Sequence, residues 1–157
     1  MDFTKEIANL LIKRNLKIST VESCTGGLLS SKLTDISGSS AFITCNLITY
    51  SNEAKKSLLG VQLNDYGVVS ENCSKQMAKG LQKLTKSDIC VSTTGIAGPT
   101  GGTPEKPVGL MYSTICTAQK EITYKIQVDS KYSRIEIKEL FVQNVLENIY
   151  HFILEHC

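Results

Sequence analysis

Ser23 is the first residue whose surroundings suggest chemistry. It stands in the run Glu22-Ser-Cys-Thr-Gly-Gly, directly after a segment with the composition of a strand. A serine at a strand-to-helix turn projects its hydroxyl over the edge of a sheet, where free N–H groups of the next helix can stabilise an oxyanion or hold a phosphate. The run is not the G-x-S-x-G of a nucleophile elbow. The plainer interpretation is that Ser23 or Thr25 caps the helix that follows.

Lys55 is the second candidate. It follows Ser51 and Asn52, both good helix N-caps, and therefore falls in the first turn of a predicted helix. The positive end of the helix dipole disfavours an ammonium there, and the same effect lowers the pKa of a lysine, as a general base near neutral pH requires. The alternative is that Lys55 and Lys56 are two solvated surface lysines. Lys56, about 100° further round the helix, fits that alternative better.

A glycine-rich segment is the third candidate. Residues 95–109 hold five of the eleven glycines and all three prolines, so we expect no regular element there. Such a loop after a buried strand offers backbone N–H groups to an anion, and long irregular segments in compact domains are usually functional or disordered. We favour a functional loop because Thr93 and Thr94 anchor it to the sheet. The usual nucleotide fingerprints, the P-loop and G-x-G-x-x-G, are absent from the sequence.

The positions of the histidines and cysteines limit the chemistry further. His151 and His156 both lie in the last seven residues, so a hydrolytic site in the body of the chain needs a base other than imidazole. The six cysteines show no C-x-x-C and no companion histidine. We therefore expect reduced, mostly buried thiols, no metal site and no cofactor.

Composition indicates one domain spanning residues 1–157. The chain has a formal net charge of +2, with 17 Lys and Arg against 15 Asp and Glu, and 41% hydrophobic residues. A dedicated nucleic-acid-binding or membrane-surface protein is usually more basic, so we expect neither partner. No apolar run approaches the ~18 residues of a membrane span, and the first residues lack the apolar core of a signal peptide. We expect a cytoplasmic location.

The elements that would position these residues alternate along the chain. Apolar periodicity and β-branched runs predict helices near 3–11, 28–36, 53–59, 71–86 and 137–153, and strands at 17–22, 42–50, 88–94, 110–116 and 122–128. This order predicts an α/β domain with a mixed sheet. In open sheets of this kind, sites form at the carboxyl ends of strands, and all three candidate segments begin there.

Four runs of sequence together resemble the CinA C-terminal domain family. They are Val21-Glu-Ser-Cys-Thr-Gly-Gly; Tyr50-Ser-Asn-Glu-Ala-Lys with Leu59-Gly-Val; Gly67-Val-Val-Ser-Glu; and Thr94-Gly-Ile-Ala-Gly-Pro with the later Gly-Gly and Glu-Lys-Pro-Val-Gly. The resemblance covers residues 4–128 in the same order. It implies a three-layer α/β/α single domain with a mixed, mostly parallel sheet. Stand-alone members of the family include nicotinamide-nucleotide amidohydrolases, which deamidate nicotinamide mononucleotide (NMN) to nicotinic acid mononucleotide and ammonia.

The resemblance also implies roles for individual residues. Ser23 would be the nucleophile, Lys55 the base and Tyr50 a proton relay beside them, which agrees with the missing histidines. The oxyanion and substrate-binding shell would comprise Thr25, Gly26, Gly27, Thr94, Gly95, Gly98, Gly101 and Gly102. The only ligand implied is a small nucleotide substrate.

One segment departs from the family pattern. Members often carry Phe-x-Gly-Asp-Arg and then a further Arg before the last helix, whereas this chain has Val128-Asp-Ser-Lys-Tyr-Ser-Arg134, with Glu136 where we align the later Arg. Arg134 or Lys131 could substitute. The departure motivates an alternative hypothesis, a catalytically silent or re-specialised nucleotide-binding module. The apolar C-terminal helix, in turn, could bury its face internally or in a homodimer.

Overall fold

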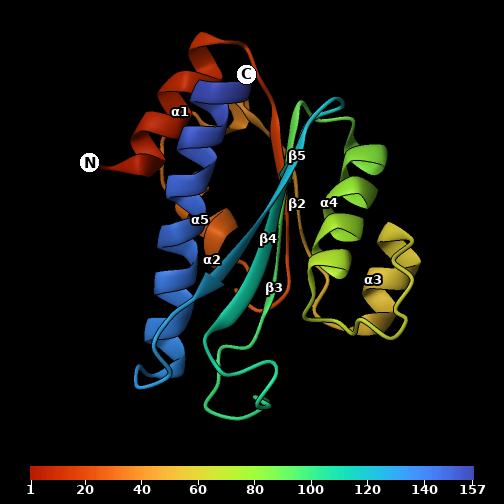
Figure 1. Cartoon of the computed structure of the whole chain (residues 1–157). Coiled ribbons are helices and arrows are strands. Elements are labelled where there is room, and N and C mark those ends of the chain that lie inside the picture. The colour runs from red at the N-terminus through yellow and green to blue at the C-terminus, as the bar shows by residue number, and fades with distance from the viewer.

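The β-branched runs of the chain form one five-stranded sheet in the computed structural model, which describes all 157 residues (Figure 1). The strands are β1 (Ile18–Glu22), β2 (Ile43–Ile48), β3 (Ile89–Gly95), β4 (Leu110–Cys116) and β5 (Glu121–Gln127), in the spatial order β2-β1-β3-β4-β5. β2, β1 and β3 pair in parallel, and the β4–β5 hairpin adds two antiparallel pairings. Only β4 therefore runs against the others, and the predicted mixed, mostly parallel sheet is confirmed.

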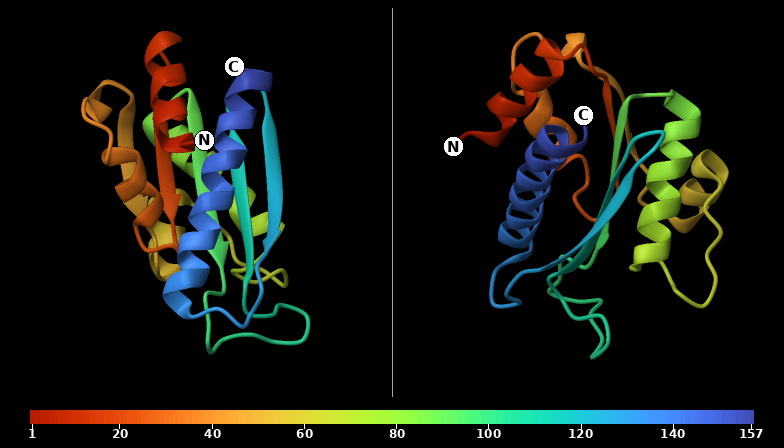
Figure 2. Two further views of the ribbon diagram at one scale, coloured as in Figure 1. Left: turned by 90° about the vertical axis from the view of Figure 1, so that its left-hand side faces the viewer. Right: turned by 45° about the horizontal axis from the view of Figure 1, so that its top comes forward.

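Helices cover both faces of this sheet. α1 (Phe3–Lys13), α2 (Leu28–Thr34) and the long α5 (Arg134–His156) lie on one face, and α3 (Asn52–Leu59) and α4 (Glu71–Thr85) lie on the other (Figures 1 and 2). A short 3-10 turn, Ser39–Ala41, precedes β2. The three-layer α/β/α architecture is confirmed, and no helix is both long and apolar enough to cross a membrane.

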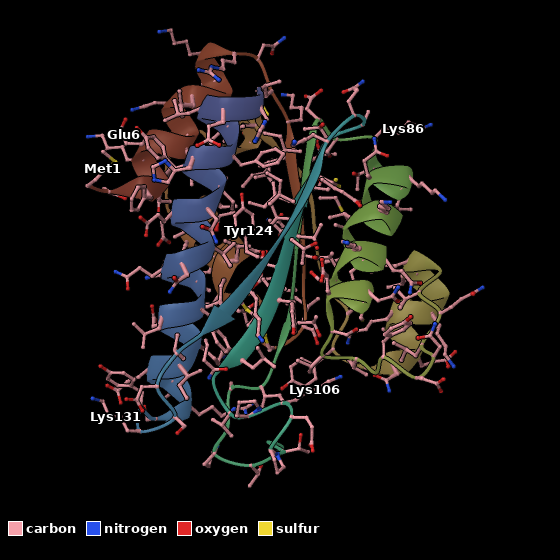
Figure 3. All side chains as sticks on the ribbon, in the orientation of Figure 1. Met1, Glu6, Lys86, Lys106, Tyr124 and Lys131 are labelled. Carbon is pink, nitrogen blue, oxygen red and sulfur yellow. The ribbon has the colours of Figure 1, made fainter.

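Two apolar cores hold the layers together. The larger one lies between the sheet and the layer of α1, α2 and α5, and the smaller one lies under α3 and α4. Phe141 and Phe152 of α5 are fully buried in the larger core, and Tyr124 of β5 packs against it (Figure 3). The apolar face of the C-terminal helix is thus buried within the chain itself.

The sheet topology brings the three candidate segments to the same end of the sheet. Because β1, β2 and β3 are parallel, the residues that follow them lie at the same end of the sheet. Figure 2 shows the 96–109 loop and the start of α5 at this end as well. β2 ends at Ile48, two residues earlier than the sequence predicts, so that Thr49 and Tyr50 form the connection into α3.

Replacing Phe141 with alanine tests whether α5 is part of the internal core. The Phe141→Ala variant should lose about 3–5 kcal/mol in the free energy of unfolding, because the change removes a buried ring and leaves a cavity. Ile135→Ala on the same helix should change it by less than about 0.5 kcal/mol, since Ile135 is 75% exposed. Denaturant unfolding measures both. Equal, small effects of the two substitutions would show that α5 does not pack as described.

Candidate active site

Ser23 lies between two parallel strand ends. It directly follows β1, and its N–H donates to the carbonyl oxygen of Thr93 at 3.1 Å, which extends the β1–β3 ladder by one residue. The register pairs Val21 with Leu47 and with Ser92. Two residues further along, Ser23 therefore stands beside Thr49 and Thr94, on the face of the sheet that α3 covers. Its side chain is nearly buried, at 9% exposure.

Lys55 reaches Ser23 from α3. Ser51 caps this helix through its hydroxyl, as the sequence predicts, and Lys55 in the first turn is fully buried at 0% exposure. Its Nζ atom lies 3.0 Å from Ser23 Oγ, 2.7 Å from the carbonyl oxygen of Thr49 and 3.3 Å from that of Tyr50. Lys55 is therefore not a solvated surface lysine, whereas Lys56 is exposed.

These three contacts suit both protonation states of Lys55. A neutral amine has two N–H donors and one lone pair, so it can donate to the two carbonyl oxygens and accept the hydroxyl proton of Ser23. An ammonium has three donors and three acceptors within reach. Lys55 can therefore exchange a proton with Ser23 without moving, because the same three contacts serve its neutral and its protonated form.

No negative charge offsets the buried Lys55 ammonium. Burial lowers the pKa of Lys55 below its ordinary value, and the neighbouring thiols of Cys73 and Cys24 act in the opposite direction. Burial, however, raises the pKa of Cys73, and it raises the pKa of Cys24 to about 12. Both thiols therefore stay protonated near neutral pH, and no carboxylate forms an ion pair with Lys55. The result is a lysine that loses its proton more readily than an exposed one.

Glu22 holds the turn that carries Ser23. Its buried carboxylate accepts from the N–H groups of Leu29 and Ser30, both at 2.9 Å, and from the hydroxyls of Ser30 and Thr25, both at 2.6 Å. It thus provides the N-terminal acceptor that Gly27, the residue at the N-cap of α2, has no side chain to supply. Because the Thr25 hydroxyl donates to Glu22, the Thr93 hydroxyl, 2.8 Å away, donates to Thr25.

The backbone of this turn supplies unpaired donors. The N–H of Gly26 donates to the carbonyl oxygen of Ser23, whereas the N–H groups of Thr25 and Gly27 have no acceptor. Gly27 adopts φ +99, and a Cβ atom there would lie 2.9 Å from Ile48 Cδ1. Only glycine fits this position without strain. With the N–H of Cys24, which also has no acceptor, the turn leaves three N–H groups near Ser23 for a developing negative charge.

A cavity of about 260 Å³ opens on Ser23. Its lining includes Tyr50 and the predicted residues Gly95, Gly98 and Gly101. The rest of the lining comes from Cys24, Ile96, Ala97, Thr100 and Arg134. The 96–109 segment thus forms one wall of the cavity beside the nucleophile.

Tyr50 lies in the cavity beside Ser23, and its hydroxyl forms a hydrogen bond with Arg134. Its ring lines the cavity and is 59% exposed, and its carbonyl oxygen, not its hydroxyl, contacts Lys55. The hydroxyl accepts from Arg134 Nη2 at 3.0 Å, and Arg134 Nη1 donates to the carbonyl oxygen of Gly98 at 2.7 Å. Arg134 therefore ties two walls of the cavity together.

Two other predicted residues lie behind the cavity wall. The Thr94 hydroxyl donates to the carbonyl oxygen of Val68 at 2.9 Å, which fixes the segment before α4 to the site. Gly102 packs against Val108, where a Cβ atom would lie 2.8 Å from the Val108 nitrogen. Neither residue lines the cavity: Thr94 fixes the segment before α4, and Gly102 shapes the loop.

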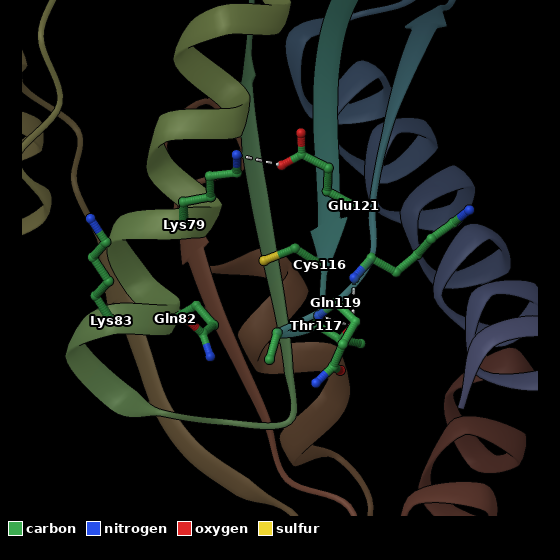
Figure 4. A pocket seen from close by; sticks show the side chains of 9 residues that line it. Lys79, Gln82, Lys83, Cys116, Thr117, Gln119 and Glu121 are labelled. Carbon is green, nitrogen blue, oxygen red and sulfur yellow. Dashed lines mark hydrogen bonds and ion pairs between the residues drawn. The ribbon is translucent and has the colours of Figure 1, made fainter.

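A larger cavity, of about 430 Å³, lies at the opposite end of the sheet beside the β4–β5 turn (Figure 4). Its lining includes Lys79, which forms an ion pair with Glu121 at 3.1 Å, and Cys116. A hydrogen bond with Cys90, together with burial, raises the pKa of Cys116. This cavity thus has no activated nucleophile, and the Ser23 cavity is the candidate active site.

Sequence reasoning left three contributors out of the predicted site. The sequence suggests Arg134 only as a substitute for a family arginine, and Thr93 only as an anchor of the loop. Glu22 was named only as part of a motif. One signal could have indicated Glu22. It ends a predicted strand directly before Ser23, and a buried carboxylate requires hydrogen-bond donors around it.

Comparison with known proteins identifies relatives of this chain. The model of the CinA C-terminal domain matches residues 1–153. A CinA-like protein of Kosmotoga olearia is 48% identical over 132 residues, which make up 82% of this chain and 32% of that protein. The chain spans about a third of the length of the curated relatives it matches.

Solved structures agree over nearly the whole chain. The competence damage-inducible protein A of Klebsiella pneumoniae has a TM-score of 0.93 at 28% identity, covering 99% of this chain and 97% of its own. The competence/damage inducible protein CihA of Agrobacterium tumefaciens has a TM-score of 0.89 at 35% identity, covering 95% and 94%.

Replacing Glu22 with glutamine tests its role in holding the turn. Glu22→Gln should lower the free energy of unfolding by about 2–3 kcal/mol, because an amide cannot accept from all four donors that the carboxylate satisfies. Glu53→Gln, in the exposed first turn of α3, should cost less than about 1 kcal/mol. Guanidinium unfolding compares the two. An unchanged stability of Glu22→Gln would contradict the network described.

Proposed function

The chain belongs to the CinA C-terminal domain family, and we propose that it is an amidohydrolase that deamidates NMN through an acyl-enzyme on Ser23. One observation carries the proposal: Lys55 Nζ lies 3.0 Å from Ser23 Oγ, buried and without a carboxylate partner. This is the geometry of a nucleophile beside its base. The substrate itself comes from the resemblance to the stand-alone nicotinamide-nucleotide amidohydrolases.

Acylation follows from the contacts of Lys55. Ser23 Oγ attacks the carboxamide carbon while Lys55 takes its proton, held in place by the carbonyl oxygens of Thr49 and Tyr50. The carbonyl oxygen of the substrate becomes an oxyanion. The unpaired N–H groups of Thr25 and Gly27 are its candidate donors, and such donors are worth about 3–4 kcal/mol each. Lys55 then returns the proton to the departing nitrogen, the C–N bond breaks, and ammonia leaves.

Deacylation repeats these steps with water. Lys55, neutral again, removes a proton from a water molecule that attacks the ester carbon of the acyl-enzyme. The same N–H donors stabilise the second oxyanion. Collapse of this intermediate breaks the ester bond, Lys55 returns the proton to Ser23 Oγ, and nicotinic acid mononucleotide leaves.

The cavity fits the reacting end of such a substrate. Its volume of about 260 Å³ is below the ~300–1,000 Å³ typical of sites that enclose a whole small molecule. It would therefore enclose the pyridine ring and its amide and leave the ribose and phosphate toward the opening. The Tyr50 ring offers a π face to the positively charged pyridinium, an interaction worth about 0.5–2 kcal/mol.

Substitution of the two central residues tests the proposal. Ser23→Ala should reduce NMN hydrolysis by at least roughly 10³-fold, because the attacking oxygen is lost. Lys55→Ala should reduce kcat by about 10²–10⁴-fold, as expected for loss of a general base. Lys56→Ala is the matched control and should keep full activity, because Lys56 is exposed and adjacent. Ammonia and nicotinic acid mononucleotide are measured together.

The same experiment separates the proposal from the alternative hypothesis. A folded wild-type protein that releases no ammonia, but whose melting temperature rises with NMN, would be a nucleotide-binding module. Full activity of Ser23→Ala would rule out the acyl-enzyme on Ser23.

The pH profile of kcat/KM should report the base. Lys55 acts in its neutral form, so kcat/KM should be low where Lys55 is protonated and should rise with pH through its lowered pKa. The midpoint should lie below the ordinary value of 10.5. Rates measured from about pH 6 to 10 locate this limb, and the residual activity of Lys55→Ala should lack it. A profile flat over this range, or the same limb in the variant, would assign the base to another group.

A further inference from the structure

α5 presents a second cation to the turn that holds Ser23. Lys138 Nζ lies 3.5 Å from the position that a Cβ atom on Gly26 would occupy, so the ammonium rests directly against this turn. Lys138 is half-buried and lies one helical turn after Arg134, on the same face of α5. Arg134 lines the cavity, and Lys138, which is not part of the lining, lies beside it against the Ser23 turn.

Neither cation has an anionic partner. Arg134 donates to the carbonyl oxygen of Gly98 and the hydroxyl of Tyr50, which are both neutral, and Lys138 has no hydrogen bond or ion pair at all. By contrast, two nearby lysines do have acidic partners: Lys32 pairs with Glu139 at 3.8 Å, and Lys131 with Asp129 at 3.7 Å.

The acidic groups around Lys138 are also engaged elsewhere. Glu136 closes a capping box with Ser133 at the start of α5. The carboxylate of Glu22 accepts four hydrogen bonds from neutral donors and forms no ion pair with Lys138. Arg134 and Lys138 thus form no ion pair with any of these carboxylates, and Lys138 lies against a backbone turn with unpaired N–H groups.

We propose that Lys138 binds the phosphate group of the substrate and makes the site select a nucleotide over the corresponding nucleoside. This inference rests on the proposed function, because it takes the amide of the same molecule to lie at Ser23. A phosphate monoester can supply the anionic partner that Arg134 and Lys138 lack, and a lysine ammonium is a compact donor to its oxygens. Arg134 adds positive charge from within the cavity while it holds the walls together.

The position of Lys138 predicts a loss specific to phosphate. Removing one charge-assisted hydrogen bond should weaken recognition roughly 10- to 100-fold. The Lys138→Gln variant should therefore show kcat/KM for NMN reduced by that factor, mainly through KM. Its kcat/KM for nicotinamide riboside, which carries the same amide without phosphate, should be unchanged. Lys125→Gln, an exposed lysine on β5, is the matched control and should leave both values unchanged. Equal losses on the two substrates, or no loss on NMN, would overturn the assignment.

Binding to the Ser23→Ala protein separates this inference from the proposed function. Calorimetric titration with NMN, with and without Lys138→Gln in the same chain, measures phosphate recognition without turnover. If the wild type does not hydrolyse NMN but Lys138→Gln weakens NMN binding, the proposed function fails and the phosphate site stands. If NMN is hydrolysed and neither KM nor binding depends on Lys138, the phosphate site fails and the proposed function stands.

Discussion

The burial of Lys55 without a counterion is the constraint on which the rest of the site depends. An ammonium removed from water is costly unless its donors are satisfied, and a lowered pKa is the usual outcome. Here the carbonyl oxygens of Thr49 and Tyr50 satisfy two donors, and Ser23 Oγ is the third contact. The early end of β2 at Ile48 turns both carbonyl oxygens toward the first turn of α3. The two carbonyl oxygens that stabilise the buried amine of Lys55 also orient it toward Ser23 Oγ.

The other features of the site keep Ser23 opposite that amine. Three parallel strands end together, so the residue after β1 lies between those that follow β2 and β3. Glu22 binds the start of α2 and the Thr25 hydroxyl, which fixes the turn after the nucleophile. On the far side of the cavity, Arg134 joins Tyr50 to the 96–109 loop. The site is thus assembled from four segments that are far apart in the sequence, each held by hydrogen bonds to a neighbour.

Much of this could be predicted from the sequence. The periodicity of apolar residues and the turn residues located the helices and strands. The absence of histidines from the body of the chain, together with the family motifs, pointed to Ser23 and Lys55. What escaped prediction depends on packing between distant segments. No local pattern indicates that the start of α5 would bring Arg134 to Gly98, or that Lys138 would rest on Gly26. The direction of the Tyr50 hydroxyl was missed for the same reason, because its partner lies 84 positions further along the chain.

Titration of Lys55 itself is the most direct test of this account. The Cε resonance of ¹³C-labelled lysine follows protonation of each side chain with pH, and Lys55→Met identifies the signal by its loss. This signal should titrate at a pKa below the ordinary value of 10.5 and below the pKa values of the exposed lysines of the same protein. A midpoint at or above that value would mean that Lys55 is an ammonium at neutral pH and cannot serve as the base for Ser23.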